Sequence, residues 1–312
     1  MEILDSLSYA QRLLTAPRPH ADNILAFHDA RVGGICTDAR LLLAPLDDHL
    51  CHRGDGVFES IAYRSRRMFQ LDAHLERMRN SAAGLQLTPP CDWESVREAI
   101  LAVAAAGGMD EGAMRVLIGR GPGGFGISPT ECPAASLYVV ALRAHTPPTA
   151  WYQRGMTAFR SAVPAKQEYL ARIKNANYLP NVLMAEEARA RGMDVALSFD
   201  AAGCLAEAAI ANIAIVDKDG VLCCPEFTNS LPGTTVLAAM RTAQDTMPTA
   251  FRKIREEELY TAREILLFSS TPLCVGITHY EGKPVGDGAT GPVAHMLRER
   301  LLELLLAEGT PF

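Results

Sequence analysis

Apolar residues recur at helical spacing in several long segments of the chain. LDAHLERMRNSAAGL predicts a helix that ends at Gly84, and WESVREAILAVAAAGG predicts a second helix closed by glycines. MEILDSLSYAQRLL, LPGTTVLAAMRTAQD and GPVAHMLRERLLELLLAEG predict three more, at the start, in the second half and at the end of the chain. A helix is also expected from about Leu179 to Arg191, because Pro180 is tolerated only in a first turn and Gly192 stops the pattern. Asn177 is its expected cap.

Shorter segments predict strands. VFESIAYRSRRMFQL suggests a hairpin that turns at residues 64–67, and AMRVLIGR, SLYVVAL, GMTAFRSAV and EILLFSS each predict one strand. DVALSFD, CLAEAAIANIAIV and VLCCP are separated by short glycine-containing turns and predict a meander, with CLAEAAIANIAIV as a single strand. The fold class is therefore α+β.

The clearest seam is RAHTPPTAW, residues 143–151, where paired prolines prevent a helix or sheet from continuing. The sequence accordingly divides into an N-terminal extension over 1–24, a small lobe over 25–146 and a larger lobe over 147–312.

Composition narrows the classes of function. The 312 residues carry a formal net charge of -6 without a basic block, which argues against a nucleic-acid partner. No apolar run approaches the roughly 18 residues of a membrane span. The start lacks the basic and apolar regions of an export signal. The eight cysteines include no CxxC pair, so reduced thiols in the cytoplasm are expected and no metal site is.

A glycine-rich stretch, GRGPGGFG at 119–126, matches G-x-G-x-x-G and follows a predicted strand. A dinucleotide site would need a helix to begin there, but ISPTECP follows with two prolines. A loop beside an active site is the favoured interpretation.

Lysine is rare enough to limit any chemistry that needs an amine. The chain has five: Lys166, Lys174, Lys218, Lys253 and Lys283. Four lie in turns, loops or a basic stretch and are expected to be solvated. Lys174 immediately precedes an apolar helix, and burial at a lobe interface would lower its pKa and free the neutral amine for a Schiff base. The alternative is an ordinary surface charge, the commoner fate of lysine.

Three other segments offer site chemistry. Glu207 lies in an apolar strand, where a buried carboxylate needs a partner such as a protonated ring nitrogen, unless it faces water from an edge. Arg77 follows His74 by three residues on one helical face, a site for phosphate or a solvated surface. PGTTV, at 232–236, presents hydroxyls and N–H groups at a helix start, as a phosphate site or as plain caps.

Taken together, these motifs resemble the class IV (fold type IV) pyridoxal-phosphate enzymes. That family includes branched-chain aminotransferases, D-amino-acid aminotransferases and aminodeoxychorismate lyase. The resemblance extends over about 25–305, with DDHLCHRGDGVFES, FQLDAHLERMRNSA, RVLIGRGPGGFG, IKNANYLPN, LPGTTV and FSSTPLCVGI in the family's order. It implies a small N-terminal α/β sandwich, a larger lobe with a barrel-like sheet, and a homodimer whose loops close the partner's site.

The resemblance also implies roles for individual residues. Lys174 would be the catalytic Schiff-base lysine, and Glu207 would keep the pyridine nitrogen protonated. Tyr178 would hydrogen-bond the phenolic oxygen. The phosphate contacts would be Arg77, Thr234, Thr235, Ser270 and Thr271.

The substrate is expected to be an amino acid, of D or branched-chain type, with a 2-oxo acid as acceptor in ping-pong exchange. Arg53 stands where many members have an aromatic residue, and Arg53, Arg115 and Arg120 are, in that order, the candidates to bind substrate carboxylate. Val236 replaces an arginine that often follows the Gly-x-Thr turn. A lyase that releases pyruvate is the alternative, since RGPGGFG also resembles its glycine-rich loop. A catalytically silent binding protein is the third hypothesis.

Overall fold

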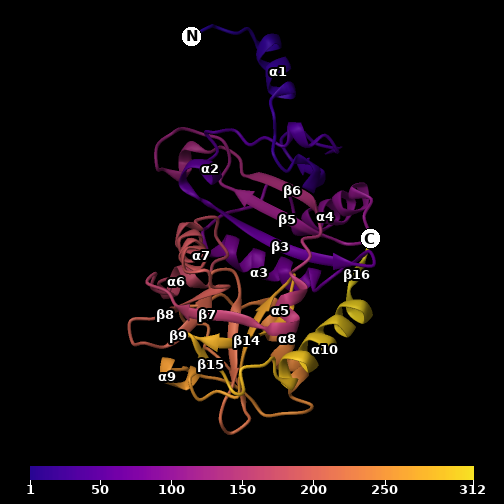
Figure 1. Ribbon diagram of the computed structural model, residues 1–312. Coiled ribbons are helices and arrows are strands. Elements are labelled where there is room, and N and C mark those ends of the chain that lie inside the picture. The colour runs from indigo at the N-terminus through magenta and orange to yellow at the C-terminus, as the bar shows by residue number, and fades with distance from the viewer.

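The computed structural model describes residues 1–312 as two lobes, each built around one β-sheet (Figure 1). Helices and strands are mixed in both lobes, so the predicted α+β class is confirmed. The small lobe has a seven-stranded sheet with only antiparallel neighbours. Its order is β16 (Thr310–Pro311), β4 (Arg67–Met68), β3 (Gly56–Arg64), β5 (Gly112–Gly119), β6 (Ser136–Arg143), β1 (Ile24–Asp29) and β2 (Ile35–Cys36).

Two of the predicted helices, α3 (Leu71–Gly84) and α4 (Trp93–Gly107), cover one face of this sheet. Helix α3 buries a stripe at helical spacing that includes Leu71, Leu75 and Met78. In β3 the period of two directs Val57 into this core, while Phe58 lines a cavity on the other side. The pattern that predicted these elements therefore also determines which face each side chain takes.

The large lobe contains a nine-stranded curled sheet. Its order is β12 (Thr249–Phe251), β11 (Leu222–Cys224), β10 (Asn212–Val216), β13 (Glu264–Ser269), β14 (Leu273–Tyr280), β7 (Met156–Arg160), β8 (Val195–Phe199) and β9 (Leu205–Ala208), with β15 (Lys283–Pro284) paired to β14. Ile213 and Ile215 pack into a core on one face, and Ala214 and Val216 into a second core on the other. The second core is covered by α8 (Thr234–Ala243) and α10 (Pro292–Glu308). Short or peripheral helices are α2 (His49–Arg53), α5 (Thr149–Arg154), α6 (Glu168–Ala171), α7 (Leu179–Arg191) and α9 (Glu256–Leu259).

The chain crosses between the lobes at the predicted seam. Strand β6 ends at Arg143, and α5 begins directly after the paired prolines, with Pro148 as its N-cap. The C-terminus returns to the small lobe, where Thr310 pairs with Met68 (Figure 1). The division at residue 147 stays a prediction about folding units.

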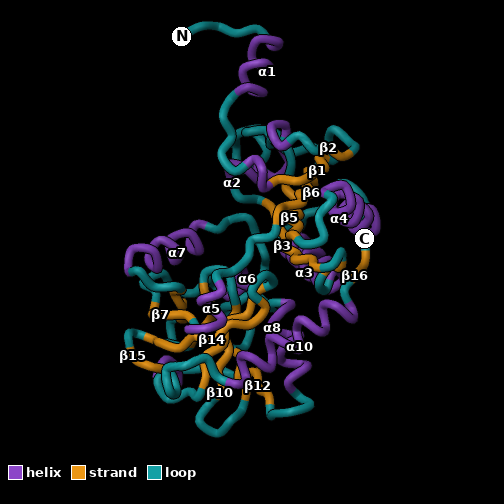
Figure 2. Tube along the Cα trace, turned by 45° about the vertical axis from the view of Figure 1, so that its right-hand side comes forward, coloured by secondary structure: helices purple, strands orange, loops and turns teal.

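The N-terminal helix α1 (Ser6–Thr15) projects away from the small lobe and buries no residue (Figure 2). Asp5 caps it by accepting a hydrogen bond from the Ser8 N–H at 2.8 Å. None of the helices combines the length and the apolar character that crossing a membrane requires.

Two local expectations were wrong. Asn177 does not cap α7, because Tyr178 occupies the N-cap position and makes no side-chain capping bond. CLAEAAIANIAIV is not one strand: the backbone bends at 209–211, so that β9 pairs with β8 while β10 pairs with β13. The bend directs Glu207 and Asn212 into the same cavity.

Candidate active site

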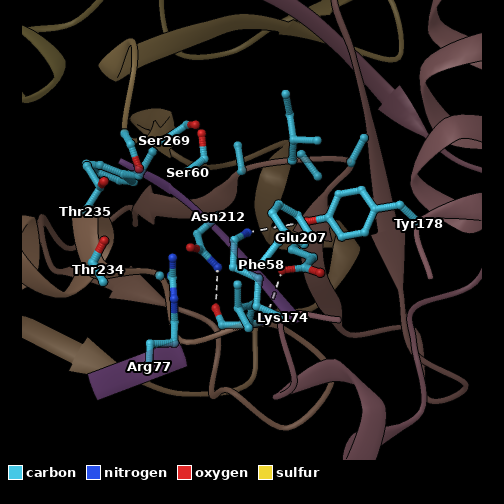
Figure 3. Close-up of a pocket in the computed structure, with 18 of the residues that line it drawn as sticks. Phe58, Ser60, Arg77, Lys174, Tyr178, Glu207, Asn212, Thr234, Thr235 and Ser269 are labelled. Carbon is cyan, nitrogen blue, oxygen red and sulfur yellow. Dashed lines mark hydrogen bonds between the residues drawn. The ribbon is translucent and has the colours of Figure 1, made fainter. Parts of the chain in front are cut away.

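A cavity of about 220 Å³ lies between the lobes and brings together most of the predicted site residues (Figure 3). Its lining includes Lys174, Arg77, Tyr178, Glu207, Thr234, Thr235, Ser270, Thr271 and Arg115. Arg77, Thr234 and Thr235 lie on one side of the view, and Tyr178 and Glu207 on the other. Residues separated by almost two hundred positions in the sequence therefore face one space.

Lys174 is held at the free edge of β3. Strand β4 pairs only with the last two residues of β3, so the earlier part of that edge is open. The segment at Lys174 occupies it: the Phe58 N–H donates to the Lys174 carbonyl at 3.0 Å, and the Ala176 N–H donates to the Gly56 carbonyl at 2.8 Å. The Lys174 N–H donates to Ser81 Oγ at 3.1 Å. The small lobe thus fixes the backbone of the lysine on two sides.

The amine of Lys174 is in an environment that favours its neutral form. Nζ lies 4.6 Å from the centre of the Phe58 ring and donates to the Tyr178 hydroxyl at 3.4 Å. Burial, followed by the positive charge of Arg77, lowers the pKa of Lys174 to about 8, although the Glu59 carboxylate opposes the shift. About one tenth of this lysine is therefore a neutral nucleophile at pH 7.

Glu207 and Tyr178 form the opposite end of the cavity from the threonines. Glu207 accepts a hydrogen bond from the Leu231 N–H at 3.0 Å, and burial raises the pKa of its carboxyl group. Burial also raises the pKa of Tyr178 to about 12, so its hydroxyl keeps its proton. A carboxyl group in such surroundings is suited to a cationic partner, and a protonated pyridine nitrogen is one.

The N-terminus of α8 forms an anion-binding end. Thr234 and Thr235 begin this ten-residue helix after Gly233, and its free N–H groups are suited to phosphate. A Cβ at Gly233 would lie 1.8 Å from Asn212 Oδ1, so any larger residue would force the Asn212 side chain to shift. Arg77 donates Nη1 to the Pro232 carbonyl at 3.2 Å, which places the guanidinium beside the same turn. This combination fits the phosphate of a flat cofactor whose other end faces Glu207.

Of the three candidate carboxylate-binding arginines, only Arg115 lines the cavity. Its guanidinium lies 5.2 Å from the centre of the Phe58 ring, and burial lowers its pKa. Arg120 forms an ion pair with Asp55 at 2.9 Å, outside the cavity. Arg53 donates Nε to the Gly126 carbonyl at 3.0 Å and is also outside. Their roles stay predictions.

The glycine-rich stretch that follows β5 does not open a helix, which agrees with the rejection of a dinucleotide site.

Lys166 was wrongly expected to be solvated. It is half-buried, lines the cavity, and lies over the Tyr178 ring with Nζ 4.8 Å from its centre. Burial lowers its pKa, against the pull of Glu207. Its loop carries no local signal of this, because the contact is tertiary. The other three predicted surface lysines, Lys218, Lys253 and Lys283, are exposed.

Sequence reasoning also missed Glu59. It is 1% exposed and accepts from Arg77 Nε at 2.8 Å and from Arg77 Nη2 at 2.7 Å. A glutamate within the apolar run VFESIA was the available signal, since a buried carboxylate requires a cationic partner.

Comparisons with known proteins bear on the family of the chain and on its fold. A family model described as amino-transferase class IV matches residues 56–280. A chloroplastic D-amino-acid transaminase of Arabidopsis thaliana is 30% identical over 308 residues, which is 96% of this chain and 81% of that protein. The crystal structure of a T.th. branched-chain amino acid aminotransferase with pyridoxamine 5'-phosphate is 27% identical, covers 90% of this chain and 94% of that one, and has a TM-score of 0.84. The 4-amino-4-deoxychorismate lyase from Pseudomonas aeruginosa shares the fold, with a TM-score of 0.75. It is 24% identical, and the match covers 84% of this chain and 95% of that one.

Proposed function

The chain is a pyridoxal-phosphate-dependent enzyme of the amino-transferase class IV family, and we propose that it transfers the amino group of a D-amino acid to a 2-oxo acid. The observation that carries the proposal is Lys174 in one cavity with Glu207 and with the phosphate-type end at Thr234 and Thr235. The Arabidopsis transaminase, which matches almost the whole chain, supports the D-amino-acid donor. The cations Arg115 and Lys166 in the cavity also favour a polar substrate over the apolar pocket of a branched-chain enzyme.

Each end of the cofactor has a proposed set of contacts. Lys174 Nζ would hold the aldehyde carbon, Glu207 would face the pyridine nitrogen, and Tyr178 would hydrogen-bond the phenolic oxygen. The phosphate would lie at the start of α8, with Arg77, Thr234, Thr235, Ser270 and Thr271 as its contacts.

When bound, pyridoxal phosphate supplies an electron sink for the pair left on the α-carbon of a substrate that loses its proton. The residues of this chain supply the proton transfer and the charges. The neutral amine of Lys174 would accept the α-proton and return it to the former aldehyde carbon of the cofactor, which lies across the nitrogen, and its lowered pKa favours both transfers. Glu207, at the opposite end of the cavity, would balance the charge of a protonated ring nitrogen. The rings of Phe58 and Tyr178, whose centres lie 4.9 Å apart, pack beside the amine and reduce its contact with water.

Arg115 is the proposed carboxylate contact within this cavity, because its guanidinium is half-buried there and forms no ion pair with a carboxylate of the chain. A bidentate pair with a substrate carboxylate would satisfy it. Arg53 is proposed to reach the cavity of a partner subunit, because it lies outside its own. Arg120 ranks last, since Asp55 already pairs with it.

A homodimer is part of the proposal. Leu179, Val182 and Leu183 are 64%, 53% and 48% exposed and lie at positions i, i+3 and i+4 of α7. Such a stripe on the outer side of a helix is suited to a second copy of the chain. The eight cysteines are all unpaired, which supports a reducing compartment such as the cytoplasm.

The test is to add single amino acids of each hand to the yellow protein without any acceptor. A D-amino acid should abolish the absorbance of the aldehyde form and release one 2-oxo acid per site, and initial rates with both substrates should give the parallel lines of ping-pong exchange. If L-amino acids convert the aldehyde form of the cofactor and D-amino acids do not, the assignment of a D-amino-acid donor is wrong. Release of pyruvate from aminodeoxychorismate without an acceptor would assign the chain to the lyases instead.

A further inference from the structure

Behind the start of α8 lies a buried chain of hydrogen bonds that the proposed reaction does not use. Glu59 of β3 and His74 of α3 are 1% and 0% exposed. His74 Nδ1 lies 2.7 Å from Glu59 Oε2, and His74 Nε2 lies 3.2 Å from Thr234 Oγ1. The imidazole therefore connects a carboxylate to one of the threonines at the proposed phosphate end.

The Glu59 side of the ring has a fixed polarity. The positive charge of Arg77, together with the hydrogen bonds from Arg77 and His74, holds the pKa of Glu59 at about 2 against the effect of burial. A carboxylate can only accept, so Nδ1 must carry a proton and donate it. Arg77 Nη2 lies farther from Nδ1, at 3.4 Å, and its shorter bond of 2.7 Å is to Glu59. Nδ1 thus keeps its proton in both charge states of the ring.

The Thr234 side of the ring then has only two states. In the neutral imidazole Nε2 has no proton, so it accepts the Thr234 hydroxyl hydrogen and leaves the oxygen lone pairs toward the cavity. In the imidazolium Nε2 donates to Thr234 Oγ1, and the hydroxyl hydrogen is free to point to an anion. Only the second state makes Thr234 a donor to phosphate.

We propose that His74 takes up a proton when phosphate binds at the start of α8, and that this proton turns the Thr234 hydroxyl from His74 toward the phosphate. His74 is a positioning residue in this scheme, because it acts through Thr234. The proton comes from solvent and is added to Nε2; no covalent bond to carbon or phosphorus changes. The inference depends on the phosphate end assigned under the proposed function.

The charges around His74 agree with such a switch. Glu59 faces it from β3, Arg77 from its own helix, and Lys174 from the segment before α7. Burial lowers the pKa of His74 despite the Glu59 carboxylate, and Arg77 and Lys174 act in the same direction as burial. Near pH 7 the ring of the ligand-free protein is therefore mostly neutral. A dianion on the Thr234 side adds negative charge close to the ring and favours the imidazolium.

Calorimetry of pyridoxamine 5'-phosphate binding to the cofactor-free protein tests the proposal. Near pH 7 the titration is run in buffers of different ionisation enthalpy, which counts the protons taken up on binding. Wild type should take up about half a proton or more beyond the His74→Gln variant, which can hydrogen-bond but does not titrate in this range. The control variant His28→Gln, at a half-buried position of β1, should take up as many protons as wild type. Equal uptake by wild type and His74→Gln would overturn the inference.

A second measurement needs no variant. In protein labelled with ¹⁵N-histidine, the Nε2 resonance of His74 should move from the position of a bare imidazole nitrogen to that of an N–H nitrogen on binding pyridoxamine 5'-phosphate. An unchanged resonance in the saturated protein would refute proton uptake at His74. The two proposals also fail separately: no binding at all contradicts the proposed function, whereas binding without proton uptake contradicts only this inference.

Discussion

Lys174 should react with pyridoxal 5'-phosphate over a pH range far below that of an ordinary lysine. Burial, followed by Arg77, lowers its pKa from 10.5 to about 8. At pH 7.5 about one quarter of Lys174 would then be neutral, against roughly one in a thousand for an unperturbed lysine, a gain of about 240-fold in reactive amine. Attachment should therefore speed up about tenfold per pH unit below the midpoint and level off above it.

The assay is to mix cofactor-free protein with pyridoxal 5'-phosphate, to reduce with borohydride at short intervals, and to map the labelled peptide at each pH. Two lysines line the cavity, so the map matters as much as the rate. The label is expected on Lys174, with a midpoint near 8. Lys166→Arg keeps the second charge but removes its amine, and this variant should label as wild type does.

Two results would refute this reasoning about Lys174. A midpoint near that of an ordinary lysine would mean that burial between the lobes does not desolvate the amine. A label on Lys166 would mean that the wrong lysine of the cavity has been assigned the chemistry.

Three further predictions concern the start of α8, the substrate contact and the dimer interface. In Gly233→Ala the new Cβ would lie 1.8 Å from Asn212 Oδ1, which costs about 1–3 kcal/mol of strain. A fluorescence titration should therefore show cofactor binding weakened about fivefold to 150-fold. Leu237→Ala, on the same helix, should bind the cofactor as wild type does. Arg115→Gln should raise KM for the 2-oxo acid about tenfold or more and leave cofactor affinity unchanged, so a KM equal to that of wild type would exclude Arg115 from carboxylate binding. Val182→Glu should shift the particle mass in light scattering from dimer to monomer, and an unchanged dimer would place the interface elsewhere.

The sequence predicted those parts of the fold and the site that have a local signal. The spacing in LDAHLERMRNSAAGL specifies α3, and Arg77 lies on it toward the cavity. Pro180 and Gly192 bound α7 at the expected residues. Lys174 stood out because lysine is rare and the following helix is apolar. For α3 and α7 the signal lies within one or two turns of chain, whereas the burial of Lys174 depends on Phe58 of the small lobe.

Other parts depend on contacts between distant segments and had no such signal. Arg120 could not be excluded from the cavity by its own sequence, since its partner Asp55 lies 65 residues away. Lys166 was misassigned because the Tyr178 ring that shields it belongs to another segment. The bend at 209–211 was missed because the apolar run of residues continues through it. The segment is divided only by its tertiary pairing, β9 with β8 and β10 with β13.

Strand β3 links these separate pieces into one site. Its open edge binds the backbone at Lys174, and the next residues alternate: Phe58 faces the lysine amine, and Glu59 faces Arg77 and His74. A slip of one residue would exchange the two faces, placing a carboxylate against the amine and a phenyl ring against the guanidinium. The register with β5, in which Phe58 pairs with Leu117 and Glu59 with Val116, prevents that slip. The reactivity of the lysine and the shape of the phosphate end therefore depend on the same strand pairing, although the two lie at different parts of the cavity.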